Sequence, residues 1–153
     1  MAGAFWTMEL SNPPSSHSTV LLVEEDVILR LGLGEYLRAC GFKVIEAANQ
    51  TEAKLVLQKG PPIHIMLLDA RLSGDGGGFK LSQWTRRTQP KIQVILTGTL
   101  VSKTEAAAKL CETKNSPPYS IDELKERIES MRSRQKKTAK PRGSIRKPRA
   151  MRG

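Results

Sequence analysis

Short apolar runs alternate with segments of helical periodicity along most of the chain. The apolar runs are continuous, as expected for strands covered on both faces. They predict strands over residues 18–24, 42–47, 63–69 and 91–98. Apolar positions at helical spacing predict intervening helices over 26–41, 49–60, 79–89 and 104–114. This alternation predicts an α/β protein whose doubly wound parallel sheet has right-handed crossovers and helices on both faces.

A final helix has the clearest pattern. Ser120 and Glu123 form a capping box, which places the start of this helix at residue 121. Apolar residues then follow at i, i+3, i+7 and i+10, as Ile121, Leu124, Ile128 and Met131. The segment "NSPPYS" at 115–120 stands where a fifth strand is expected and has little strand character. The fifth strand is therefore predicted to be shortened or degenerate.

The 153 residues divide into three parts by composition and charge. Residues 1–18, rich in Ser, Pro and Asn, predict a disordered leader. Residues 19–130 carry the α/β pattern and form one predicted domain. Residues 131–153 contain ten of the 25 Lys and Arg and no Asp or Glu, so the net charge of +10 belongs to this segment. Its composition predicts a basic, disordered tail.

The two cysteines show no metal-ligand spacing and have no neighbouring histidine. Cys40 and Cys111 lie in predicted helices, and we interpret them as free, buried thiols of a reducing compartment. The amino terminus has no basic region followed by an apolar run, and no stretch approaches the roughly 18 apolar residues of a membrane span. These features predict a cytoplasmic protein.

Acidic residues and a hydroxyl follow the predicted strands, at the edge where ligands bind in such sheets. Glu24 and Glu25 follow the first strand, Asp69 ends the third and Thr97 ends the fourth. If the first and third strands are neighbours, the carboxylates converge and require a counter-cation. Mg²⁺ prefers such oxygen ligands, and a carboxylate can act as nucleophile towards phosphorus. Asp26 is interpreted mainly as a helix cap.

Four segments resemble the receiver domain of two-component response regulators, and the resemblance covers about Ser18 to Ser130. They are "VLLVEEDVILR", "IMLLDARLSGDGG", "VILTG" and "PPYSIDELKERI". The resemblance implies a flavodoxin-like (βα)5 fold and a phosphoryl group that passes from a histidine kinase or phosphotransfer protein to Asp69. It also implies Thr97 as the switch hydroxyl. The implied Mg²⁺ ligands are Glu24, Glu25, Asp69 and the backbone carbonyl of Arg71.

The chain departs from the family pattern at two functional positions. Glu25 stands where the family has aspartate, and its longer side chain shifts a ligand oxygen further than an octahedral ion readily tolerates. The family also has a lysine before the proline that precedes the last helix, where this chain has Pro117. Lys114 is the candidate for a displaced switch lysine, the alternative being an ordinary solvated lysine. No aromatic residue lies just upstream of either position, so the aromatic switch residue of many receivers has no obvious counterpart.

The basic tail has two interpretations. It either solubilises the protein or contacts a nucleic acid or another acidic partner, with affinity that falls as salt rises. The tail has no module that reads DNA sequence. Its candidate contact residues are Lys136, Lys137, Lys140, Arg142, Arg146, Lys147 and Arg149.

Together these features predict a single-domain response regulator in phosphorelay signal transduction. It would be phosphorylated on Asp69 and would signal through altered binding of a downstream protein. The alternative is a degenerate, phosphorylation-independent receiver that acts as a binding module, with nucleic-acid contact through the tail. No phosphate-binding glycine loop, nucleophile elbow or zinc motif occurs, so the protein is not expected to be an enzyme.

Overall fold

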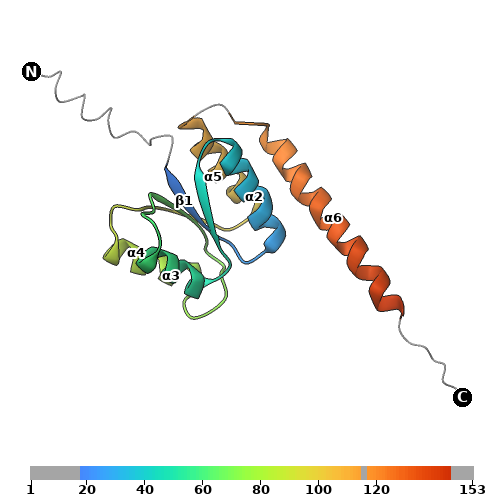
Figure 1. Cartoon of the computed structure of the whole chain (residues 1–153), viewed down its shortest axis with the longest axis horizontal. Coiled ribbons are helices and arrows are strands. Elements are labelled where there is room, and N and C mark those ends of the chain that lie inside the picture. Colours follow the sequence, from blue (N-terminus) through green and yellow to red (C-terminus); the bar gives the residue numbers. More distant parts are fainter. Residues whose placement is uncertain (1–17, 115–116, 146–153) are drawn as a thin grey trace, which may run out of the picture.

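The computed structural model describes residues 18–114 and 117–145, which form a parallel four-stranded sheet with helices on both faces (Figure 1). The strand order is β2-β1-β3-β4. The strands are β1 (Thr19–Val23), β2 (Lys43–Ala47), β3 (Ile65–Asp69) and β4 (Gln93–Thr97). The helices are α2 (Val27–Ala39), α3 (Gln50–Lys59), α4 (Gly77–Thr88), α5 (Leu100–Glu112) and α6 (Ile121–Ile145). The predicted doubly wound fold is confirmed.

The strand register decides which residues meet at the carboxyl edge of the sheet. Val23 of β1 lies opposite Leu68 of β3, and Asp69 lies opposite Thr97 of β4. All residues of β1 and β3 are buried, which explains why both strands are continuous apolar runs. Because all four strands are parallel, their carboxyl ends share one edge, and the polar residues that follow them gather there.

Two apolar cores flank the sheet. Helices α2, α5 and α6 pack on one face, around Leu33, Tyr36 and Ile128, which are fully or almost fully buried. Helices α3 and α4 pack on the opposite face around Met66 and Leu81 (Figure 1). Both faces of the central strands are thereby shielded from water, as the apolar runs require.

The fifth strand is absent from the described residues. Helix α5 begins at Leu100, four residues earlier than predicted, and continues to Glu112, and α6 begins at Ile121. The capping box of Thr99 and Ser102 fixes this early start of α5. The expectation of a shortened or degenerate fifth strand is thus consistent with the described part of the chain.

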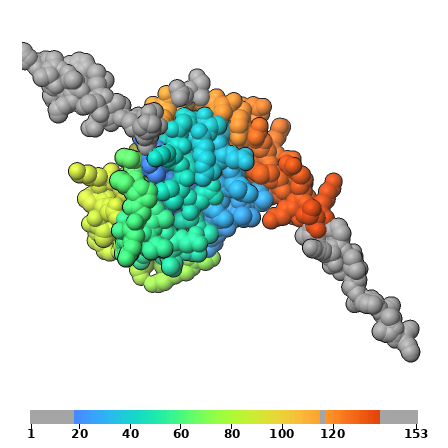
Figure 2. Space-filling model, viewed as in Figure 1, coloured from blue at the N-terminus to red at the C-terminus, as the bar shows by residue number. Residues whose placement is uncertain are grey.

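The expectation of disorder is wrong for residues 131–145, which continue α6 as one helix. Lys, Arg and Gln are good helix formers, and propagation from turns that are already packed is favourable, which accounts for the helix as far as Lys140, before Pro141. The first half of α6 packs on α2 (Figure 2), and the helix continues outward from the body (Figure 1). The remaining tail residues, 146–153, and leader residues 1–17 lie outside the described residues. Ser18, assigned to the leader, is buried and accepts a hydrogen bond from the Lys43 N–H.

The two cysteines are not free thiols, and the prediction is wrong on this point. Cys40 at the end of α2 and Cys111 in the last turn of α5 form a disulfide, with their Cα atoms 5.5 Å apart. Both residues are buried where α2 packs against α5. Their spacing of 71 residues gave no sign of this pairing, because it arises only from the packing of the two helices.

Candidate functional site

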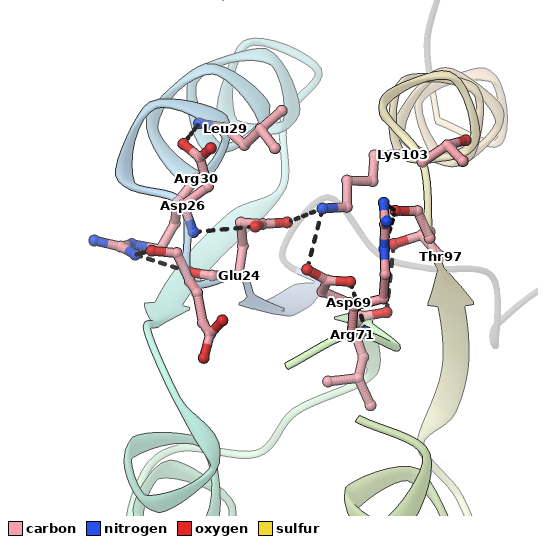
Figure 3. A network of polar contacts seen from close by, with 12 residues as sticks. Glu24, Asp26, Leu29, Arg30, Asp69, Arg71, Thr97 and Lys103 are labelled. Carbon is pink, nitrogen blue, oxygen red and sulfur yellow. Dashed lines mark hydrogen bonds and ion pairs between the residues drawn. The ribbon is translucent and has the colours of Figure 1, made fainter. Parts of the chain in front are cut away.

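A buried lysine lies between two carboxylates at the carboxyl edge of the sheet (Figure 3). The Nζ atom of Lys103, on α5, lies 2.7 Å from Oε1 of Glu24 and 3.2 Å from Oδ2 of Asp69. Glu24 directly follows β1 and Asp69 ends β3, so the sheet brings the carboxylates together as the sequence predicts. All three residues are more than 90% buried. We call Glu24, Asp69 and Lys103 the charged triad.

Sequence reasoning missed Lys103 and proposed Lys114 instead, and that proposal is wrong. Lys114 Nζ donates to the Gly41 carbonyl at 3.0 Å and lies over the Phe42 ring. These residues precede β2, at the opposite edge of the sheet from the triad. Helix α5 runs from the carboxyl ends of the strands back to their amino ends. Lys114 follows this helix and therefore lies at the amino ends, whereas Lys103 lies in the first turns of α5, beside the carboxyl ends. The signal for Lys103 was its helical spacing from buried Ala107 and Cys111, which places it on the inward face of α5.

The remaining oxygens of both carboxylates are also engaged. Oε2 of Glu24 accepts the Asp26 N–H at 3.1 Å, and Oδ1 of Asp69 accepts the Arg71 N–H at 2.8 Å. Burial raises the pKa of Glu24 above its usual value, although the Lys103 hydrogen bond and the Asp26 N–H oppose that rise. The triad is therefore a closed network in which each carboxylate has an ammonium and a backbone donor.

Glu25 does not join the triad. Its side chain is exposed to solvent, and its Oε2 accepts the Ser73 N–H at 2.8 Å, in the loop between β3 and α4. The side chain of Arg71 crosses to the end of β4, where Nε donates to the Gly98 carbonyl at 3.1 Å and Nη2 contacts the same oxygen. The sequence therefore predicted only part of the spatial arrangement of the expected ligands.

The residues present do not fit Mg²⁺ in this arrangement. Lys103 supplies the positive charge between Glu24 and Asp69, and the other oxygens of these carboxylates accept backbone N–H groups. Within 18–114 and 117–145, no three His, Cys, Asp or Glu side chains are grouped so that they could hold a metal ion. The cation that balances the convergent carboxylates is a lysine ammonium.

Thr97 and Gly78 lie directly beside Asp69. The Thr97 side chain is buried, and its hydroxyl donates to the Leu68 carbonyl at 3.4 Å, a weak bond that leaves the hydroxyl available to another acceptor. Gly78, in the first turn of α4, packs on the backbone of Asp69 so closely that an added Cβ would lie 2.1 Å from the Asp69 carbonyl oxygen. Only glycine allows this approach of α4 to the end of β3.

The triad opens on a cleft of about 510 Å³. Asp26 forms part of its wall: it caps α2 by accepting the Ile28 and Leu29 N–H groups and pairs with Arg132 of α6 at 2.8 Å. Partial burial favours a higher pKa for Asp26, but the Leu29 hydrogen bond and the Arg132 charge lower this pKa overall. The lining residues are Glu24, Glu25, Asp26, Leu29, Asp69, Arg71, Lys103 and Arg132.

The predicted tail contacts lie away from this cleft or beyond the described side chains. Lys136 and Lys137 are exposed on the far half of α6. Lys140 and Arg142 continue the backbone of that helix, and Arg146, Lys147 and Arg149 lie outside the described residues. No helix in the described part of the chain is long and apolar enough to cross a membrane.

Comparison with known proteins identifies the family. Residues 20–115 match the family described as the response regulator receiver domain. A response regulator from Thermotoga maritima is 25% identical, with a TM-score of 0.51 over 76% of this chain and 98% of its own. A receiver domain protein from Methanospirillum hungatei JF-1 is 19% identical, with a TM-score of 0.50 over 79% of this chain and 98% of its own, and so supports the fold alone.

One curated relative is a cyclic di-GMP phosphodiesterase from Thermotoga maritima, 41% identical over 59 residues. This match covers 39% of the chain and only 15% of the relative, so the phosphodiesterase name belongs to that protein. The family match, by contrast, includes all four strands from Val20 onward and the charged triad. On this evidence the chain belongs to the response regulator receiver domain family.

Proposed function

We propose that the chain is a phosphorelay receiver that accepts a phosphoryl group on Asp69 and signals by altered protein binding. The observation that supports this most directly is the Lys103 ammonium, placed 3.2 Å from Asp69 although the family's lysine position holds Pro117. Receiver domains of two-component systems interact with histidine kinases or phosphotransfer proteins and with downstream targets. A lysine at the acceptor gives this chain a group that can respond to a change of charge there.

The chemistry follows from the residues around Asp69. A carboxylate oxygen of Asp69 attacks the phosphorus of a phosphohistidine, the new P–O bond forms, and the P–N bond breaks as imidazole leaves. The positive charge of Lys103 offsets the negative charge on the phosphoryl oxygens. Thr97 lies opposite Asp69 and can donate its hydroxyl to one of them. No step is assigned to Mg²⁺, because the carboxylates that would hold it are engaged by Lys103 and backbone donors.

Phosphorylation also suggests how the signal leaves the site. A phosphoryl group on Asp69 competes with Glu24 for the ammonium of Lys103, and Lys103 is fixed to α5. A shift of the Lys103 ammonium from Glu24 towards the phosphoryl group therefore changes the position of α5. We propose that the surface of α5 is where the downstream protein detects the phosphorylated state.

The test is to incubate the purified chain with acetyl phosphate and measure its intact mass. We expect a gain of one phosphoryl group in the wild type and in the control variant Asp75→Asn, whose carboxylate lies in the neighbouring exposed loop. The gain should disappear in Asp69→Asn. Wild-type protein that gains no mass at any donor concentration, with or without Mg²⁺, would refute the proposal.

Metal dependence provides a separate prediction. Millimolar Mg²⁺ should leave the melting temperature of the wild type unchanged, because a ligand raises it only if it binds the folded state. Differential scanning calorimetry measures this directly. A rise in melting temperature that disappears in Asp69→Asn would show that the carboxylates rearrange to bind the ion.

A second candidate function is a phosphorylation-independent binding module. The closed triad favours it, because Asp69 is only 8% exposed and both oxygens of its carboxylate already accept hydrogen bonds. This alternative predicts that Asp69→Asn binds the downstream protein as well as the wild type does. The phosphorelay proposal instead predicts that acetyl phosphate changes binding by the wild type and not by Asp69→Asn.

A further inference from the structure

The two edges of the sheet differ in how they are protected. On β2, Lys43 and Ala47 hydrogen bond to the β1 side, so the backbone groups of Val44 and Glu46 point outward. Arg38 donates to the outward carbonyl of Val44 at 3.1 Å and pairs with the Glu46 carboxylate at 3.0 Å. Charged side chains of this kind discourage the addition of another strand.

The β4 edge has no such protection among the described residues. The Gln93 N–H donates to the His64 carbonyl and the Thr97 carbonyl accepts the Ala70 N–H, so these two residues face the β3 side. Alternation along the strand leaves the N–H and C=O groups of Val94 and Leu96 pointing outward. No described strand pairs with this edge, and Val94, Ile95 and Leu96 are only half-buried. An apolar, unpaired edge is a template for strand addition.

A groove between β4 and α5 extends this edge. Its volume is about 330 Å³, and its apolar lining includes Ile95, Ala106 and Leu110. Glu105 and Lys109 of α5 are exposed and also line it. Ser102 accepts the Gly98 N–H at 2.9 Å, so α5 starts beside the end of β4 and runs back along it. Glu105 therefore lies nearer the carboxyl end of β4 and Lys109 nearer its amino end.

We propose that a second copy of this chain covers the β4 edge, by antiparallel pairing of β4 with β4 about a two-fold axis at Ile95. In this register Val94 of one copy faces Leu96 of the other, and each such pair exchanges two N–H···O bonds. The axis also brings Lys109 of one copy towards Glu105 of the other at both ends of the interface. The edge is thus complementary to itself in hydrogen bonding, apolar surface and charge, as an isologous dimer requires. This inference does not depend on phosphorylation of Asp69.

The first test is sedimentation equilibrium of the full chain, comparing the wild type with Val94→Pro. Proline at 94 removes only an outward N–H and leaves the bonds to β3 intact. Each copy loses the N–H···O bond that Val94 donates across the interface, so the dimer loses two. Its dissociation constant should therefore rise about 30-fold. Val44→Pro makes the same change on the β2 edge and should leave dimerisation unchanged. Circular dichroism confirms that both variants are folded.

Charge reversal provides a second test that does not use proline. Lys109→Glu and Glu105→Lys should each weaken the dimer, and the double variant should restore it, because the two charges exchange places across the axis. A wild type that stays monomeric at high micromolar concentration would overturn the proposal, as would a double variant that remains as weak as the single ones. Amide protons of Val94 and Leu96 that are protected from exchange in a monomer would also overturn it, since another segment must then cover the edge.

Discussion

Replacing Lys103 by Met should be one of the most destabilising single changes in this domain. Methionine keeps the length of the side chain but removes the ammonium that lies 2.7 Å from Glu24 and 3.2 Å from Asp69. The carboxylates are 3% and 8% exposed, so water from the cleft can replace the lost charge only in part. Removing one partner of a buried ion pair costs about 3–5 kcal/mol. We expect a loss near the lower value at pH 7, because each carboxylate keeps one backbone donor.

The loss should depend on pH in a definite direction. Burial already raises the pKa of Glu24, and removing Lys103 removes the hydrogen bond and the positive charge that lower it, so this pKa rises further in the variant. Between the usual pKa of a glutamate and the higher value in the folded variant, the folded state binds more protons than the unfolded chain. The free energy of unfolding of the variant therefore increases as the pH falls through this window. At pH 4.5 the deficit should therefore be smaller than at pH 7.

Urea unfolding followed by circular dichroism at pH 7 and pH 4.5 measures both effects. Lys91→Met is a suitable control because Lys91 is exposed in a turn, and its effect should stay within about 0.5 kcal/mol at both pH values. A Lys103→Met variant that loses less than about 1 kcal/mol at pH 7 would contradict the buried ion pair. A deficit that does not change with pH would contradict the role given to Glu24.

Two further substitutions test other parts of the site. Gly78→Ala should lower the free energy of unfolding, measured in urea, by about 1–3 kcal/mol and should slow phosphorylation, because the added Cβ would collide with the backbone of Asp69. The control Gly98→Ala should be nearly neutral, because the space around its Cβ is open. Asp26→Asn should lower the free energy of unfolding by at most about 1 kcal/mol at pH 6. The pKa of Asp26 is lowered in the folded state, so its charge stabilises the fold above pH 3.8, and this contribution is lost as the carboxylate is protonated at lower pH. The difference between the variant and the wild type should therefore vanish below pH 3.8. An Asp26→Asn deficit that persists in strong acid would show that the charge is not responsible.

The acceptor side of the site could be predicted because it depends on strands. Continuous apolar runs predicted β1 and β3. Glu24 directly follows the first of these runs and Asp69 ends the second, so the positions of both carboxylates could be read from the sequence. The convergence of the two carboxylates then required only that β1 and β3 be neighbours, which the sheet order confirms. Local pattern and simple topology were sufficient for this part.

The other side of the site could not be predicted because it depends on helix packing. Lys103 reaches the carboxylates only because α5 starts early and turns one face towards the end of β3. The sequence offered Lys114 on grounds of distance along the chain, but a helix returns the chain to the opposite edge of the sheet. The Cys40–Cys111 disulfide was missed for the same reason, since it depends on which faces of α2 and α5 meet.

The attachment of α6 gives the domain a mechanical property. Arg132 holds this helix to Asp26, whose N–H in turn donates to Glu24, and beyond Arg132 the helix continues for about 20 Å at the usual rise per residue. A tilt of roughly 10° at that attachment would move the far end of the helix by roughly 3 Å. Changes in the cleft that are too small to alter the surface of the sheet would thus appear as larger displacements at the far end of α6.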